Sequence, residues 1–103
     1  MMSDAETEVR REEKDGHGRY IIALAPGVEA EMSFRRGANG TVIVDHTGVP
    51  KALEGRGIAG RLMAALIADA RHEPFTIVPL CSYVAAQFRR HPEWQDLLAA
   101  PAA

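Results

Sequence analysis

Hydrophobic and polar positions alternate through much of the first half of the chain. The clearest case is segment 28–36, where Ala30, Met32 and Phe34 alternate with charged or hydroxyl residues, as in a strand with one buried face. A charged edge strand is expected first, because charges at a sheet edge discourage pairing with other molecules. By these patterns and by β-branched and aromatic content, strands are predicted at 9–15, 19–24, 28–36 and 41–47.

The hydrophobic period changes from strand to helix after Gly57. The apolar positions then recur at helical spacing and form one stripe, which consists of Ala59, Leu62, Met63, Leu66, Ile67 and Ala70. Pro74 ends this helix, because proline cannot continue a helical hydrogen-bond pattern, and 75–80 is predicted as a short buried strand.

Two further helices are predicted near the C-terminus. Ser82 is the expected N-cap of a helix that runs to Arg90. Pro92 then starts a short last helix, since proline is pre-organised for the first helical position, and this helix packs through Trp94, Leu97 and Leu98.

The order of these elements predicts the fold class. The early strands are expected to pair antiparallel, whereas the strand–helix–strand crossover within 41–80 implies a parallel pair. The prediction is an α+β fold with a mixed, mostly antiparallel sheet and a C-terminal β-α-β-α unit. One domain is expected at 9–100, after a flexible tail at 1–8.

Composition limits the classes of function. The 103 residues are 47% hydrophobic and carry a net charge of -2, which gives no global electrostatic reason to bind nucleic acid or an anionic membrane. Cys81 is the only cysteine, which excludes an internal disulfide and a cysteine-based zinc cluster and fits a reducing compartment. No apolar run approaches the roughly 20 residues that span a bilayer, and the N-terminus is polar rather than signal-like. A cytoplasmic protein without a metal site is expected.

The most informative segment is the glycine-rich stretch that leads from a strand into the long helix. The first N–H groups of a helix lack intrahelical partners and lie at the positive end of the helix dipole, so they can bind an anion. Gly55, Gly57 and Gly60 remove side chains where a pyrophosphate would sit, while Arg56 and Arg61 add positive charge. A tight structural entry to the helix, with no ligand, explains the same glycines equally well. The spacing fits neither a Rossmann fingerprint nor a P-loop.

At this segment the chain resembles the GCN5-related N-acetyltransferases, whose Gln/Arg-x-x-Gly-x-Gly/Ala signature binds the pyrophosphate of acyl-coenzyme A. Gly57 and Ala59 match the signature, and Glu54 stands where the family has Gln or Arg. The closer resemblance is to small stand-alone members, which lack the first helices of larger ones. The blocks VDHTGVPKALEGRGIAGRLM, IVPLCSYVAAQF and RRHPEW carry this resemblance.

The resemblance implies acetyl-CoA or coenzyme A as the cofactor and an amine as the acceptor. It implies that the strands ending near Val49 and Leu80 splay apart around the pantetheine arm, which pairs with main-chain groups near 47–49. The positions expected to bind the cofactor are Thr47, Val49, Gly55, Arg56, Gly57, Ile58, Ala59, Gly60 and Arg61. A monomer or weak dimer is expected.

Few residues are candidates for the chemistry. Cys81, just before a helix, is either a transient nucleophile, a proton donor to coenzyme A, or a small buried hydrophobe. Tyr83 is a candidate general acid or a packing aromatic, as many related enzymes have a tyrosine near this place. His46, placed by alternation on the face of Val42 and Val44, is the first choice of base because imidazole accepts a proton near neutral pH, and Asp45 and Glu54 are alternatives.

Three functions are compatible with these patterns. The first is an acetyl-CoA-dependent N-acetyltransferase that acts on an amine of a small molecule or protein. The second is a non-catalytic module that binds coenzyme A or acetyl-CoA, and the third is an interaction domain whose glycine turn binds nothing. Amine-dependent turnover separates the first from the second, and saturable binding of coenzyme A separates both from the third.

Overall fold

A computed structural model describes residues 8–99 of the chain. Five strands and two α-helices form it, with three 3-10 turns among the described residues. In chain order the elements are β1 (Arg10–Lys14), β2 (His17–Ala25), β3 (Val28–Arg36), η2 (Ala38–Gly40), β4 (Thr41–Gly48), η3 (Lys51–Leu53), α1 (Ile58–His72), β5 (Thr76–Pro79), α2 (Ser82–Arg90) and η4 (Pro92–Leu97).

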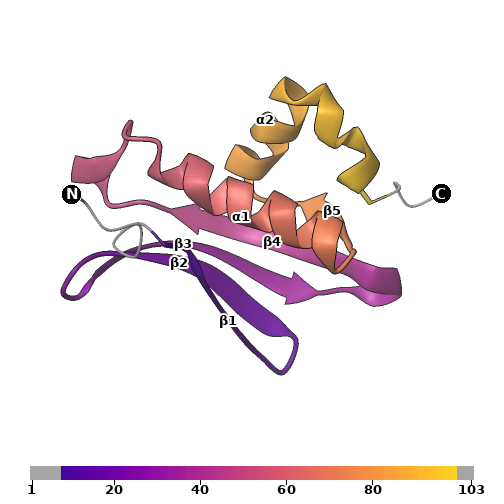
Figure 1. Cartoon of the computed structure of the whole chain (residues 1–103), viewed down its shortest axis with the longest axis horizontal. Coiled ribbons are helices and arrows are strands. Elements are labelled where there is room, and N and C mark those ends of the chain that lie inside the picture. The colour runs from indigo at the N-terminus through magenta and orange to yellow at the C-terminus, as the bar shows by residue number, and fades with distance from the viewer. Residues whose placement is uncertain (1–7, 100–103) are drawn as a thin grey trace.

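The strands form one sheet in the order β1-β2-β3-β4-β5 (Figure 1). The first four strands pair antiparallel with their neighbours, and β4 pairs parallel with β5 across the α1 crossover. The predicted α+β class, the mixed sheet and the C-terminal β-α-β-α unit are therefore confirmed.

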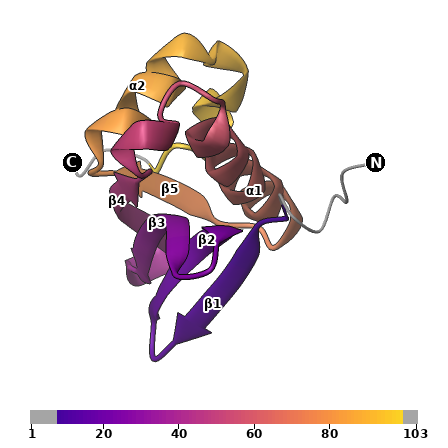
Figure 2. The ribbon, with the colours of Figure 1, turned by 90° about the vertical axis from the view of Figure 1, so that its left-hand side faces the viewer.

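One hydrophobic cluster joins the sheet to α1 and α2. The predicted stripe of α1 supplies Leu62, Met63, Leu66, Ile67 and Ala70, all of which are buried. Figures 1 and 2 show α1 lying along one face of the sheet, with α2 beside β5. Because α1 is anchored along this stripe, the position of its N-terminal end is fixed relative to β4.

A bulge in β4 changes which side chains face the core. Phe34 pairs with Val44, but the preceding residue of β3, Ser33, pairs with His46, so Asp45 is an extra residue. The prediction that His46 continues the face of Val42 and Val44 is therefore wrong: both valines are buried, whereas His46 is exposed on the opposite face. Thr47, paired with buried Met32, takes the core-facing place instead.

The sheet face opposite α1 is covered by charged side chains rather than by helices. On β1, β2 and β3, Arg19 lies within ion-pair distance of Glu12, Glu29 and Glu31, at 3.5, 3.3 and 3.4 Å. Ile21 is fully buried although it lies outside the main cluster, and its partners on the two neighbouring strands are Arg10 and Glu31, whose long side chains can shield it. This face can therefore stay in contact with water, as antiparallel sheets commonly do.

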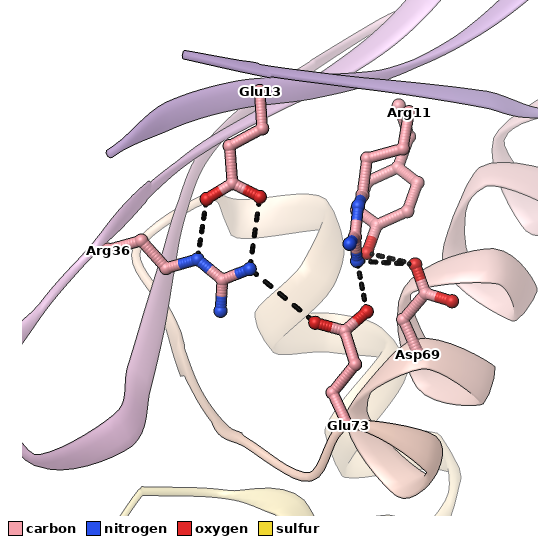
Figure 3. A network of polar contacts seen from close by, with 6 residues as sticks. Arg11, Glu13, Arg36, Asp69 and Glu73 are labelled. Carbon is pink, nitrogen blue, oxygen red and sulfur yellow. Dashed lines mark hydrogen bonds and ion pairs between the residues drawn. The ribbon is translucent and has the colours of Figure 1, made fainter. Parts of the chain in front are cut away.

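A second polar network ties the edge strand to α1 (Figure 3). Arg11 of β1 bonds Asp69 at 2.9 Å and also bonds Glu73, both near the C-terminal end of α1. Burial is the main cause that raises the pKa of Tyr20, whose hydroxyl donates to Asp69 at 2.8 Å. Glu13 accepts from Arg36 at 2.7 and 3.0 Å, and this pairing is the main cause that lowers the pKa of Glu13.

One local prediction at the C-terminal part needs correction. Ser82 is the first residue of α2 rather than its N-cap; Cys81 is the N-cap, in extended conformation and without a side-chain capping bond. The chain is tied to the sheet as far as residue 99, because the N–H of Ala99 donates to the carbonyl of Ile77 at 2.9 Å. Residues 1–7 of the expected tail and residues 100–103 lie outside the described part.

Candidate functional site

The candidate site is a pocket where β4 extends beyond β5. The parallel pairing of the two strands ends at Val44 and Pro79, while β4 continues to Gly48. The pocket beyond this point has a volume of about 430 Å³, and its lining comes from the end of β4, the loop before α1, the start of α1, and α2. The lining residues are Thr47, Val49, Leu53, Glu54, Gly55, Gly57, Ile58, Ala59, Gly60 and Tyr83.

The N-terminus of α1 opens into this pocket without a side-chain cap. Gly57 is the N-cap in a left-handed conformation (φ 78°), and the first backbone bond of the helix runs from Arg61 N–H to Gly57 C=O. The preceding N–H groups, those of Ile58, Ala59 and Gly60, thus have no acceptor within the helix and lie at the positive end of its dipole. A Cβ at Gly57 or Gly60 would have no atom within 4 Å, so the space above this backbone is open.

The charges around the helix end are mixed. Arg56 and Arg61 are exposed beside the pocket and form no ion pair within residues 8–99. Glu54 lines the pocket itself. An anion at the helix N-terminus would therefore be attracted by the arginines and repelled by one carboxylate.

Cys81 lies behind the pocket wall rather than in its lining. Its side chain is 9% exposed, its N–H donates to the Val44 carbonyl at 2.9 Å, and its Sγ lies 3.3 Å from Thr47 Oγ1. The thiol is therefore at the point where β4 and β5 separate, one side chain away from the pocket.

Tyr83 is the titratable aromatic residue of the pocket. It is half-buried on the first turn of α2, and burial is the main cause that raises its pKa above the ordinary value for tyrosine. A phenol with a raised pKa is fully protonated at neutral pH, so Tyr83 can donate a proton or a hydrogen bond there.

His46 and Asp45 lie on the other face of β4. Ser33 Oγ donates to Asp45 Oδ1 at 2.7 Å, and the His46 ring lies over Gly48, where an added Cβ would be 3.1 Å from Nε2. β3 pairs with β4 as far as Gly48, but β5 does not accompany it beyond Val44, so the edge of β4 beside these side chains is unpaired on the side of the pocket. The structure thus separates His46 from Cys81 and Tyr83 by the thickness of the strand.

The pocket brings together most residues predicted to bind the cofactor. Thr47, Val49 and five of the loop and helix positions line it, while Arg56 and Arg61 flank it. Leu53 was missed, as an apolar loop residue carries no sequence signal for a site, and so was the contact between the Thr47 hydroxyl and Cys81. Trp94 is expected to pack on Leu97 and Leu98. In the structure its ring stacks on the ring of His91, with the ring centroids 3.9 Å apart. It also makes an edge contact with the ring of Phe88, at 6.0 Å between centroids.

Other hollows of the structure are less suited to an anionic ligand. A hollow of about 450 Å³ near the C-terminal end of α1 is lined by residues such as Arg71 and Asp96, which pair with each other at 3.0 Å. Within residues 8–99 no three His, Cys, Asp or Glu side chains are grouped to hold a metal ion. The helices of that same part of the chain are too short or too polar to cross a bilayer.

The overall arrangement defines the class of fold. The structure is similar to the solution structure of a GCN5-like protein from Staphylococcus aureus, with a TM-score of 0.67 and 23% sequence identity. The similarity covers 94% of this chain and 92% of the other. The chain therefore has a GCN5-like fold.

The family follows from the sequence match. The family model for the GCN5-related N-acetyltransferases matches residues 19–97, which span the sheet from β2 onward, both α-helices and the pocket. The chain therefore belongs to the GCN5-related N-acetyltransferase family, as its sequence motifs indicated.

Proposed function

We propose that the protein is an N-acetyltransferase that takes its acetyl group from acetyl-CoA and transfers it to an amine of a small molecule or protein. The observation that carries this proposal is the uncapped N-terminus of α1, which opens into the pocket beside the unpaired end of β4. A helix end of this kind suits a pyrophosphate, and an unpaired strand edge suits an extended amide-containing arm. Coenzyme A contains a pyrophosphate followed by an extended pantetheine arm with amide groups.

The backbone supplies most of the proposed binding. The N–H groups of Ile58, Ala59 and Gly60 would hold the pyrophosphate, with Arg56 and Arg61 adding charge, and these contacts do not depend on the residue at position 54. The main chain from Thr47 to Val49 would pair with the pantetheine amides, since β5 leaves it unpaired. The acetyl group, at the end of the pantetheine arm, would then lie beside the unpaired edge of β4, near the bulge at Asp45.

The two faces of β4 suit the two halves of the reaction. On the exposed face, His46 can accept the proton that the amine must lose before it attacks, with Asp45 beside it. On the pocket side, Cys81 and Tyr83 can each return a proton to the sulfur of coenzyme A when the carbon–sulfur bond breaks. The exposed face is open to an acceptor as large as a protein chain. The reaction is placed in the cytoplasm, where a lone cysteine stays reduced.

Calorimetric titration with acetyl-CoA and coenzyme A tests the binding half of the proposal. Gly57→Glu puts bulk and negative charge at the helix N-terminus and is expected to abolish saturable binding. The matched control is Gly27→Glu: Gly27 also has positive φ (75°) and open space around it, but it lies at the β2–β3 turn. If wild type releases no heat and gains no thermal stability with either ligand, the acetyltransferase proposal is wrong.

Turnover separates the enzyme from a non-catalytic binding module. The measurement is release of free coenzyme A from acetyl-CoA, with and without a panel of primary amines and lysine-containing peptides. An amine-dependent release that His46→Gln reduces supports the transferase. Saturable binding with no amine-dependent release across the panel would favour the module.

A further inference from the structure

The β4 bulge places the hydroxyl of Thr47 next to the thiol of Cys81. Without the extra residue Asp45, position 46 would follow Val44 on the core-facing side, and an imidazole would lie there. With the bulge, Thr47 takes that side, and its Oγ1 lies 3.3 Å from Cys81 Sγ. The irregularity that turns His46 outward is thus the same one that creates the Thr47–Cys81 contact.

The hydroxyl can serve both protonation states of the thiol. A threonine hydroxyl carries one hydrogen and two lone pairs, so it accepts from S–H and, after rotation, donates to a thiolate. Cys81 is the only side-chain partner of Thr47 Oγ1 within residues 8–99, so no competing bond holds the hydroxyl hydrogen there. By contrast, Thr41, on the same strand, uses its hydroxyl to donate to the Ala38 carbonyl at 2.8 Å.

We propose that Thr47 relays the proton in acetyl transfer: its hydroxyl, which lines the pocket, accepts the hydrogen of the Cys81 thiol behind the wall and passes a proton to the sulfur of coenzyme A. This inference rests on the proposed function and selects Cys81 as its acid. A proton path whose two groups are already hydrogen-bonded to each other is oriented when the leaving group needs the proton, and orientation of that kind lowers the barrier.

Acetyl transfer by this route balances in protons and electrons. The amine nitrogen forms a bond to the carbonyl carbon, and the carbon–sulfur bond breaks with its electron pair left on sulfur. The Thr47 hydroxyl gives its proton to that sulfur while its oxygen takes the thiol proton of Cys81, and the renewed O–H of Thr47 then donates to the resulting Cys81 thiolate. The proton lost by the amine passes to His46 and to water, and water reprotonates Cys81. No oxidant or reductant takes part, and Cys81 is never acylated.

Few ionisable side chains of the described residues lie around the Cys81 thiol and could affect its protonation. Tyr83, two residues further along the chain, is an ionisable neighbour: burial is the main cause that raises its pKa, and the charge of a Cys81 thiolate adds to that rise. β4 presents Val44 and Thr47 to it and turns Asp45 and His46 to the opposite face. The chain leaving β5 brings Pro79 and Leu80, which do not ionise.

Raman spectroscopy tests the contact directly, because a protein with one cysteine shows one S–H stretching band. Thr47→Val removes the hydroxyl at nearly constant shape and is expected to move the band to higher wavenumber, where a free S–H absorbs. Thr47→Ser should keep the wild-type position. Thr41→Val, the same substitution at the other end of β4, is the matched control and should leave the band unmoved. Thr47→Ala replaces Thr47→Val if the valine variant does not fold.

Turnover then tests the role. Thr47→Val is expected to lower kcat by about tenfold, a part of what a general acid supplies, with KM for acetyl-CoA unchanged because the backbone of residue 47 is intact. Thr47→Ser should restore kcat. The inference is overturned if the S–H band of Thr47→Val coincides with wild type, or if the band moves and kcat does not. If wild type releases no coenzyme A, the proposed function has failed, and the Raman comparison still decides whether the hydroxyl holds the thiol.

Discussion

The backbone N–H of Cys81 donates to the carbonyl oxygen of Val44 at 2.9 Å, the final backbone bond between β4 and the chain leaving β5 among the described residues. Beyond it, β4 continues with its edge unpaired and α2 begins at the next residue. The opening of the strands therefore depends on the main chain of Cys81, whereas the chemistry assigned above depends on its side chain.

Cys81→Ser separates these two roles. The backbone bond to Val44 and a hydrogen bond to Thr47 both survive the change, so the thermal midpoint is expected to stay within a few degrees of wild type and the affinity for coenzyme A within about twofold. A serine hydroxyl is a far weaker acid than a thiol, so kcat should fall about tenfold or more. Steady-state kinetics and calorimetry check this, and full activity in the serine variant would transfer the acid role to Tyr83.

Tyr83→Phe is the counterpart of that variant. If Cys81 is the acid, removal of the phenol hydroxyl should change kcat by less than about threefold, because the ring still fills its place in the pocket lining. A loss of about a hundredfold, with acetyl-CoA binding retained, would contradict the assignment to Cys81 and favour Tyr83. The measurement is kcat at saturating acetyl-CoA, compared with the melting curve of each variant.

Glu54→Gln is expected to strengthen the binding of coenzyme A. Glu54 lines the pocket beside the free N–H groups of α1, so its carboxylate repels a pyrophosphate, and the amide removes that charge with little change in shape. A Coulomb interaction of about 1 kcal/mol near a protein surface corresponds to a roughly fivefold lower dissociation constant. Calorimetry at low and high salt checks it, since the gain should shrink as salt screens the charges. Unchanged or weaker binding would place the pyrophosphate away from Glu54.

The elements could be predicted from sequence because burial imposes a period on them. The α1 stripe that includes Leu62, Leu66 and Ala70 is buried in the structure as its spacing indicates. The bulge was not predictable, because alternation of Val42, Val44 and His46 looks the same with or without an extra residue, and only pairing with β3 reveals it. The wrong face for His46 and the missed role of Thr47 have this single cause.

The capping error at α2 has a different origin. Serine is a far commoner N-cap than cysteine, so Ser82 was the natural choice. In the structure the helix begins one residue earlier than that, because the N–H of Cys81 is already held by Val44 and its carbonyl accepts from Ala85 at 3.0 Å. A tertiary hydrogen bond thus sets the start of the helix in place of a local side-chain preference.

Tyr20→Phe is expected to destabilise the protein by about 1.5 kcal/mol, the low end for a hydrogen bond to a charged group, because Asp69 keeps its bond to Arg11. The ring remains buried, so no cavity contributes. Urea unfolding of wild type and variant measures the difference. Tyr83→Phe is the control for stability, since no hydrogen bond of its hydroxyl is found within residues 8–99, and its unfolding free energy should stay within about 0.5 kcal/mol of wild type.

The pair between Glu13 and Arg36 makes stability depend on acid pH. Arg36 holds the pKa of Glu13 below its ordinary value of 4.5, so the folded state favours the ionised carboxylate. The stabilisation is therefore complete above pH 4.5 and is lost as pH falls from there through the lowered pKa. Because both groups are partly exposed, the contribution at neutral pH is expected to be about 0.5–1 kcal/mol.

Glu13→Gln tests this dependence. The difference in unfolding free energy between wild type and the variant should be largest at neutral pH and should shrink steadily below pH 4.5. The double-mutant cycle with Arg36→Gln isolates the pair, because Arg36 also lies 3.5 Å from Glu73, and the acid-dependent part should vanish when Arg36 is absent. Urea unfolding between pH 7 and pH 3 measures all four proteins, and an equal loss of stability at every pH would mean that Glu13 contributes by packing rather than by charge.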